Sequence, residues 1–190
     1  MGRWDPDARG RLTQAATELY LERGFDRATV AEIAKRAGLT ERTFFRHFAD
    51  KREVLFAGSV QLQELMVGAV AAAPASAAPI DAVAAGVLAA AQVLKDQDHS
   101  RRRQAIIAAN PVLQERELIK MASLASAFAE ALRRRGVGEP AASLSAEAGV
   151  AVFRVAFERW VADGNEKDLA WLLRESFDEL KVAVGGSSRR

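Results

Sequence analysis

The ten residues LTERTFFRHF, numbers 39–48, combine three aromatic rings with two arginines and a histidine. On a helix, Phe44 and Phe48 fall on one side because they are four residues apart. Arg42 and Arg46 share a row on nearly the opposite side. A helix this short is marginal in water by itself. The segment therefore predicts a short helix that is held in place by its rings and turns its cations outward.

The preceding segment supplies a second short helix. Thr29 and Glu32 have the spacing of a capping box, which marks the start of a helix. Gly38 ends that helix, and Thr40 is a natural N-cap for the next one. Two short helices joined by a turn with glycine, together covering about 29–48, match a helix-turn-helix. The second helix of this motif enters the major groove of DNA, where arginine commonly reads guanine.

Most of the remaining sequence also has helical periodicity. Leu12, Ala15 and Leu19 lie on one face of a first helix, and Asp50 opens a long helix through about Ala72. Further helices are predicted at about 80–95, 101–109, 112–135, 141–163 and 167–183. No stretch alternates strongly enough to be a strand. We therefore expect an all-α protein of about nine helices, with an N-terminal three-helix domain and a larger C-terminal helical domain.

The composition bears on the class of protein. The chain has 190 residues, of which 49% are hydrophobic and 27% charged, so it can bury a core. It has no cysteine, which excludes disulfides, thiolate ligands and cysteine nucleophiles. With only two histidines, Asp96 and His99 form a single D-x-x-H rather than the paired sets of a di-metal bundle. We expect no enzyme, metal or cofactor; a helical-bundle enzyme or metal-binding protein is the alternative.

The distribution of charge favours a nucleic-acid partner at the N-terminal end. Residues 1–52 hold 11 Lys/Arg and 8 Asp/Glu, whereas the remainder holds 16 and 17. The net charge of +2 argues against a second alternative, a non-specific architectural DNA binder, because such binding depends on many cationic contacts. The N-terminus has no apolar run of signal-peptide length, and prolines interrupt the most apolar region. We expect a cytoplasmic protein that does not bind a membrane.

Residues 8–56 resemble the DNA-binding domain of the TetR (tetracycline-repressor) family. The residues that carry the resemblance are, in order, Gly24-Phe25, Ala28-Thr29-Val30, Ile33-Ala34, Ala37-Gly38-Leu39, Thr43 to Phe48, Lys51 and Leu55. The resemblance implies a ligand-responsive regulator, most often a repressor, that binds a palindromic operator in double-stranded DNA as a homodimer. We expect a DNA-binding domain at 6–56, a ligand-binding and dimerisation domain at 57–184, and a disordered tail at 185–190.

The resemblance also implies roles for individual residues. Thr29 and Lys51 would hold phosphates at helix starts, and His47 would contact another phosphate. Arg42 and Thr43 would lie at base edges or at the nearby backbone. The complete expected DNA-binding set is Thr29, Thr40, Arg42, Thr43, Phe45, Arg46, His47 and Lys51.

Two members of this set differ in kind from the others. Phe45 occupies a place where the family most often has tyrosine, so one phosphate hydrogen bond is missing there. Its ring can still pack on a sugar or on a thymine methyl group. Arg46 stands at a position that varies within the family, so the resemblance assigns it no defined role.

The last two helices, at about 141–183, usually form the dimer interface in this family. Here apolar residues cover more than one face of the first helix and one stripe of the second. These residues are Val150, Phe153, Val155, Phe157, Trp160, Val161, Leu169, Leu172, Leu173, Phe177 and Leu180. We expect them to pack against a second copy in a four-helix bundle. The alternative is that they pack only within their own domain.

The segment 101–136 is similar to the C-terminal domains of TetR-type regulators with acyl-CoA-like effectors. This resemblance implies a small hydrophobic or acyl-CoA-like effector, bound in an apolar pocket. The residues expected to bind it are Asn110, Phe128, Phe153, Phe157 and Trp160. For each of the aromatic residues, the alternative is an ordinary place in the core.

Overall fold

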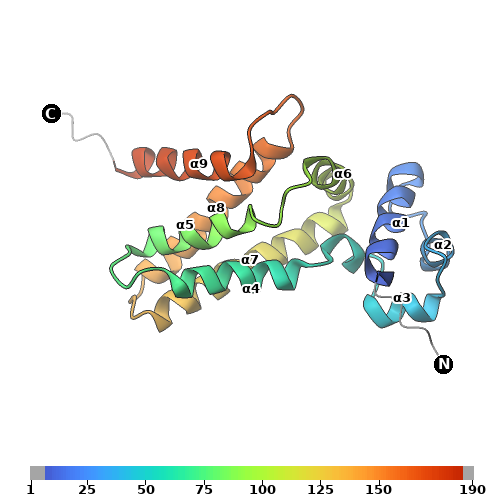
Figure 1. Ribbon diagram of the computed structural model, residues 1–190, viewed down its shortest axis with the longest axis horizontal. Coiled ribbons are helices and arrows are strands. Elements are labelled where there is room, and N and C mark those ends of the chain that lie inside the picture. The colour runs from blue at the N-terminus through green and yellow to red at the C-terminus, as the bar shows by residue number, and fades with distance from the viewer. Residues whose placement is uncertain (1–6, 186–190) are drawn as a thin grey trace. The chain divides into compact units, whose positions relative to one another are not determined.

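The computed structural model describes residues 7–185 and folds them into helices joined by short loops (Figure 1). The nine α-helices in this range are α1 (Ala8–Arg23), α2 (Val30–Arg36), α3 (Glu41–His47), α4 (Ser59–Ala72), α5 (Pro79–Ala90), α6 (Gln97–Ala108), α7 (Pro111–Arg134), α8 (Ala141–Val161) and α9 (Leu169–Val184). A 3-10 helix, η1 (Glu53–Phe56), precedes α4. No residue of the described range is in a strand, and the predicted all-α class is confirmed. Of the predicted disordered tail, residues 186–190 lie outside the described residues.

The chain divides into two compact units. Within the described residues, the smaller unit comprises 7–59 together with Arg102–Glu115, and the larger unit comprises Val60–Arg101 and 116–185. The first boundary falls close to the expected one at residue 56. The difference is the segment Arg102–Glu115, which was expected in the larger domain and clusters with the smaller unit instead.

The core of the smaller unit explains this difference. Its fully buried side chains come from α1, α2 and α3, and also from the end of α6 and the start of α7. They include Leu12, Ile33, Phe44, Ile107 and Leu113. Burial of each such side chain is worth about 1.5–3 kcal/mol. Arg103 adds a polar link, because its Nε donates to the Leu55 carbonyl at 2.7 Å and its guanidinium lies 5.1 Å from the Phe56 ring centroid.

The predicted long helix from Asp50 to Ala72 is wrong, because the structure divides it into η1 and α4. Gly58 lies between them with a φ of +83°, a left-handed conformation that favours glycine. The stretch Glu53–Ala72 is apolar and long enough to cross a membrane by length and composition alone, a test that core helices of soluble proteins also pass. Here Val54 is buried in the core of the smaller unit and Val70 in that of the larger.

Close helix crossings hold the larger unit together. A Cβ atom on Gly86 of α5 would lie 2.8 Å from the Met66 carbonyl oxygen of α4, so the two helices touch through their backbones. At the end of α7, the Arg135 guanidinium donates to the carbonyls of Ala73 at 2.6 Å and Pro74 at 2.7 Å. The bond to Ala73 supplies a donor to a carbonyl at the end of α4, whereas the Pro74 carbonyl also accepts from the Ala77 N–H at 2.9 Å.

The apolar faces of α8 and α9 pack within this unit. The buried residues of the predicted interface are Val150, Phe153, Trp160, Val161, Leu169, Leu172, Leu173 and Phe177. Phe157 and Leu180 pack against the same core. Of the predicted set, only Val155 is exposed, at 43%. A single subunit already covers the buried residues, which is the alternative that the sequence left open for them.

Candidate DNA-binding surface

Helix α3 begins and ends with caps that its own sequence supplies. The Thr40 Oγ1 accepts from the Thr43 backbone N–H at 3.2 Å, and the two threonine hydroxyls lie 3.1 Å apart. At the other end, Phe48 leaves the helix in an extended conformation, and its N–H donates to the Phe44 carbonyl at 2.9 Å. These bonds define a helix of seven residues, which confirms the predicted short helix.

The side chains of α3 divide between core and solvent. Phe44 is 0% exposed and Phe48 is 4% exposed, whereas the Phe45 ring is 55% exposed. Arg42 and Arg46 are exposed on the outward side. The Phe44 and Phe45 rings meet edge to face with centroids 5.4 Å apart. The predicted separation of rings and cations is therefore confirmed, and Phe45 belongs to the outward face.

The turn between α2 and α3 depends on Gly38. Its φ of +66° is in the left-handed region that other residues rarely adopt. A Cβ atom there would also lie 2.9 Å from the Arg11 guanidinium, which donates a hydrogen bond to the Ala37 carbonyl. Arg11 of α1 thus anchors the turn, and a larger residue at position 38 would displace it.

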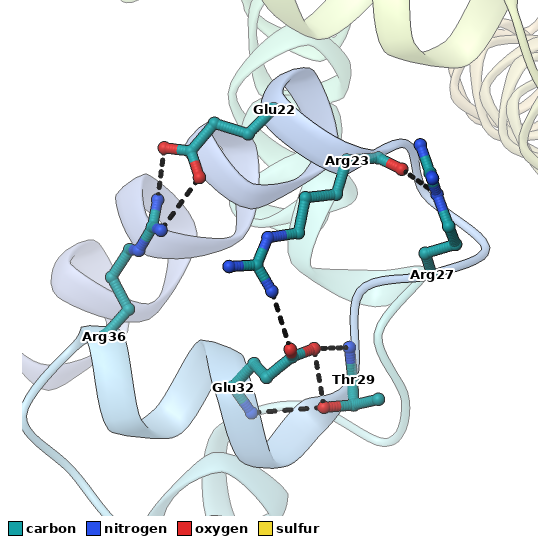
Figure 2. A network of polar contacts seen from close by, with 6 residues as sticks. All are labelled: Glu22, Arg23, Arg27, Thr29, Glu32 and Arg36. Atoms are coloured by element: carbon teal, nitrogen blue, oxygen red, sulfur yellow. Dashed lines mark hydrogen bonds and ion pairs between the residues drawn. The ribbon is translucent and has the colours of Figure 1, made fainter.

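A network of polar contacts joins α1 to α2 (Figure 2). The Arg36 guanidinium makes two bonds to the Glu22 carboxylate, at 2.5 and 2.8 Å. Arg23 donates to Glu32 Oε1 at 2.9 Å. These ion pairs lower the pKa of the Glu22 carboxyl chiefly through the hydrogen bond from Arg36. Two separate ion pairs therefore connect α1 to α2 at different points along the helices.

The predicted capping box at the start of α2 is confirmed. The Thr29 Oγ1 accepts from the Glu32 N–H at 3.2 Å, and the Thr29 N–H donates to the Glu32 carboxylate at 3.0 Å (Figure 2). The bond from the Thr29 backbone is the largest cause of the lowered Glu32 pKa. Thr29 is exposed, but its hydroxyl and its amide both bind Glu32, so a DNA phosphate would compete with that carboxylate.

Lys51 and His47 have surroundings that differ from those expected. The Lys51 ammonium donates to backbone carbonyls of the loop between α1 and α2 rather than pointing to solvent. The His47 Nε2 is buried without a hydrogen-bond partner, so a phosphate contact through this nitrogen needs another rotamer. Burial, followed by the charges of Arg46 and Arg9, lowers the pKa of His47. The histidine is therefore neutral at neutral pH.

Two arginines of α1 were absent from the predicted set. Arg11 anchors the turn, and the Arg9 guanidinium carbon lies 5.4 Å from the centroid of the Phe48 ring. Both stand in the first turn of α1, which holds no acidic residue. Cations are unfavourable at a helix N-terminus. Two arginines in that place are the feature of the sequence that could have pointed to a partner for each of them.

The residues expected to bind an effector are divided between the two units. Asn110 belongs to the smaller unit, where its Nδ2 donates to the Ile106 carbonyl at 2.6 Å. The four aromatic residues belong to the larger unit. Phe128 is 0% exposed, and Phe157 lies between Phe153 and Trp160 with ring centroids 6.0 and 5.7 Å away. Asn110 therefore acts as a local cap, and the aromatic residues are part of the core.

Both parts of the chain match known protein families. Residues 12–57 match the family described as bacterial regulatory proteins, tetR family. Residues 77–184 match the family described as the MftR C-terminal domain. The first match contains the helix-turn-helix, and the second covers α5 to α9.

Individual relatives match this chain over different parts of its length. The HTH-type transcriptional regulator TcmR of Streptomyces glaucescens is 37% identical over 75 residues, which are 40% of this chain and 33% of TcmR. This match thus spans about a third of that relative's length.

Among solved structures, the complex of SmeT with triclosan has a TM-score of 0.66 at 20% identity, covering 93% of this chain and 90% of that one. FadR of Thermus thermophilus, a repressor solved with lauroyl-CoA, has a TM-score of 0.53 at 23% identity, covering 96% of both chains. These similarities concern the fold. Together with the two family matches, they lead to the conclusion that the chain belongs to the TetR family of transcriptional regulators.

Proposed function

We propose that this regulator is a homodimeric repressor that binds a palindromic operator and leaves it when a small hydrophobic or acyl-CoA-like effector binds. The observation that carries the proposal is the outward face of α3. Arg42, Phe45 and Arg46 are exposed there, on a helix that Phe44 fastens to the core. Such a face offers both cationic and apolar contacts to a major groove.

Each exposed side chain of α3 has a distinct proposed partner. Arg42 stands in the first turn, where recognition helices meet base edges, and its guanidinium suits the O6 and N7 of guanine. Thr43 and Thr40 suit phosphate oxygens. Phe45 has no hydrogen-bonding group, so its proposed partner is a thymine methyl or a sugar. Arg46, one turn after Arg42, would contact a phosphate or a second base.

The remaining proposed contacts come from outside α3. Thr29 stays in the set as an exposed residue at the start of α2, and His47 requires a rotamer change. Arg9 is added, because it is exposed beside Phe48 and carries a charge close to His47. Lys51 is removed from the set, because its ammonium is already bound inside the domain.

The proposed dimer interface lies on the outer stripe of α8, together with exposed residues of α9. Leu144, Ala148, Ala151 and Val155 recur at helical spacing, and Leu144 and Val155 are 66% and 43% exposed. On α9, Trp171 is 41% exposed. Large exposed apolar side chains in such a row favour burial against a second copy. Dimerisation would bring two α3 helices to half-sites about 34–36 Å apart, or a multiple of that.

The proposed effector binds among the apolar side chains of the larger unit. The triclosan of the SmeT complex and the lauroyl-CoA of the FadR complex are the ligands in the two similar folds. Phe157 is only half-buried between two other aromatic rings, which makes it the side chain we expect nearest to a ligand. An effector would act by binding better to the conformation whose α3 spacing does not fit DNA. A regulator of this kind works in the cytoplasm.

The experiment that tests DNA binding is selection of bound duplexes from a random pool. A specific regulator should favour the selected sequence over random duplex by ~10³-fold or more. Arg42→Ala should relax the preference at one base position, at a cost of ~1–3 kcal/mol. Failure of the wild-type protein to enrich any sequence, or equal competition by random duplex, would refute the proposed function.

The effector is tested on the selected duplex. Lauroyl-CoA should release the DNA and raise the melting temperature of the protein, whereas coenzyme A without an acyl chain should do neither. Triclosan serves as a second apolar probe without a nucleotide. If neither compound changes DNA binding or melting, the proposed effector class is wrong, while the result for DNA binding stands by itself.

A further inference from the structure

Lys51 lies between the end of α3 and the start of η1, and its ammonium is fully occupied. The Nζ donates to the carbonyls of Phe25 at 2.9 Å, Asp26 at 3.1 Å and Ala28 at 3.0 Å. An ammonium group has three N–H donors, and here each has a carbonyl within hydrogen-bonding distance. These three acceptors belong to the loop that joins α1 to α2.

Two further contacts place Lys51 at a junction of the domain. Its Nζ lies 4.5 Å from the centroid of the Phe25 ring, a cation–π distance. Its backbone carbonyl accepts a bond of 2.7 Å from the hydroxyl of Tyr20 on α1. The Tyr20 and Phe25 rings meet edge to face, 5.2 Å between centroids. Side chain and backbone of one residue therefore join α1, the α1–α2 loop and the chain that leaves α3.

We infer that Lys51 is a positioning residue, which fixes the end of the recognition helix to α1 and to the α1–α2 loop without binding a DNA phosphate. The inference rests on the proposed function. The other end of α3 is held at the turn, where Arg11 binds the Ala37 carbonyl. With both ends fixed, the outward side chains of α3 keep one orientation before DNA arrives, which reduces the cost of ordering them on binding.

A phosphate contact by Lys51 would require the loss of this arrangement. To reach solvent, the ammonium would leave three carbonyls without their donor, and it would gain one phosphate in return. The geometry also distinguishes lysine from arginine. A rotating ammonium can serve three converging acceptors, whereas a planar guanidinium points its donors in a fixed fork.

Four variants of the full-length protein distinguish a positioning role of Lys51 from a contact with a DNA phosphate. Lys51→Met removes the charge and the donors, and Lys51→Arg keeps the charge but not the donor geometry. Tyr20→Phe removes one bond and no charge, so it remains informative if Lys51→Met fails to fold. The control is Lys35→Met, which removes the same charge from an exposed lysine of α2. Thermal unfolding curves of the variants identify a temperature at which all of them are folded.

The first measurement needs no DNA. Amide hydrogen exchange is followed by mass spectrometry in segments 24–30, 40–48 and 141–161 of the free protein. In Lys51→Met and Lys51→Arg, the exchange rate should rise in the first two segments and stay unchanged in the third. Lys35→Met should have the exchange rates of the wild type in all three. Unchanged exchange in all three segments would overturn the inference, because loss of an anchor should raise the exchange rate of the segments that it holds.

The second measurement is affinity for the selected duplex as a function of salt concentration. Removal of one phosphate contact should lower the slope of log K against log salt by about 0.9. Lys51→Met and Lys51→Arg should instead weaken binding at every salt concentration, by about tenfold for Lys51→Met, with the wild-type slope. Tyr20→Phe should weaken binding several-fold in the same manner.

The outcomes divide clearly. A slope reduced by about 0.9 in Lys51→Met, with wild-type affinity and slope in Lys51→Arg, would make Lys51 a phosphate ligand and overturn the inference. Wild-type affinity in Lys51→Met would also overturn it. If the wild-type protein selects no duplex, the proposed function fails, and the exchange measurement still decides whether Lys51 anchors the loop.

Discussion

Gly149 of α8 lies so close to Val83 of α5 that a Cβ atom on the glycine would stand 2.1 Å from the valine Cγ1. Val83 is 0% exposed, so other atoms of the core enclose it. The contact sets how closely these two helices of the larger unit pack. A glycine in the middle of a long helix, which helix propensity alone disfavours, is therefore explained by this crossing.

Gly149→Ala should destabilise the protein by about 1–3 kcal/mol, because the new methyl group overpacks a closed contact. The measurement is thermal or denaturant unfolding. Gly68 of α4 is the matched control, since a Cβ atom there would meet nothing within 4 Å. Gly68→Ala should raise stability by about 0.5–1 kcal/mol through helix propensity. A variant Gly149→Ala that is as stable as Gly68→Ala would contradict the observed crossing.

The adjacent rings of α3 should have opposite phenotypes. Phe44→Ala should lower the free energy of unfolding of the smaller unit by about 3–5 kcal/mol, because the ring is fully buried. Phe45→Ala should leave the melting transition nearly unchanged, because more than half of its ring faces solvent. Phe45→Ala should instead reduce selectivity for thymine in the duplex selection. Equal melting transitions for the two variants would show that the two rings have been assigned to the wrong sides.

The thymine contact of Phe45 has its own control. Replacement of thymine by uracil in the selected duplex removes only the C5-methyl group. The wild-type protein should bind the uracil duplex more weakly, and Phe45→Ala should bind both duplexes alike. If uracil weakens both proteins by the same factor, the methyl group is read by another residue.

His47 should make stability depend on pH. Burial, then Arg46 and Arg9, lowers its pKa below the ordinary 6.5 in the folded protein. The unfolded chain then binds the proton more readily, so the contribution of His47 to stability is complete above pH 6.5 and decreases as the pH falls toward the lowered value. His47→Gln should show a shallower loss of stability on acidification, measured by urea unfolding. The same pH dependence in both proteins would contradict a lowered pKa.

Leu144→Glu should separate the proposed dimer. The side chain is 66% exposed in the single subunit, so a charge there costs little within the fold but opposes burial against a second copy. Light scattering after size exclusion should give a monomer whose melting is close to that of the wild type, with weakened binding to a palindromic duplex. Leu118→Glu is the control, because that residue is 64% exposed on α7, outside both α8 and α9. A dimeric Leu144→Glu would place the interface elsewhere.

The sequence by itself determined the local features of this protein. A capping box needs only Thr29 and Glu32 at the right spacing, and the structure contains both of its bonds. The division of α3 into buried and exposed sides follows from helical periodicity, which is a property of neighbouring residues. For the same reason the predicted helix 141–163 is close to the observed Ala141–Val161.

Tertiary structure alone decided which of these features meet. Lys51 binds carbonyls 23 to 26 residues earlier in the chain, and Ile107 enters a core formed mostly by the first 56 residues. Sequence periodicity marks a face as apolar but does not say what covers it, so the faces of α8 and α9 were expected to meet a second copy and pack inside one subunit instead. Local bonds depend on spacing along the chain, whereas these contacts depend on how whole helices close around one another.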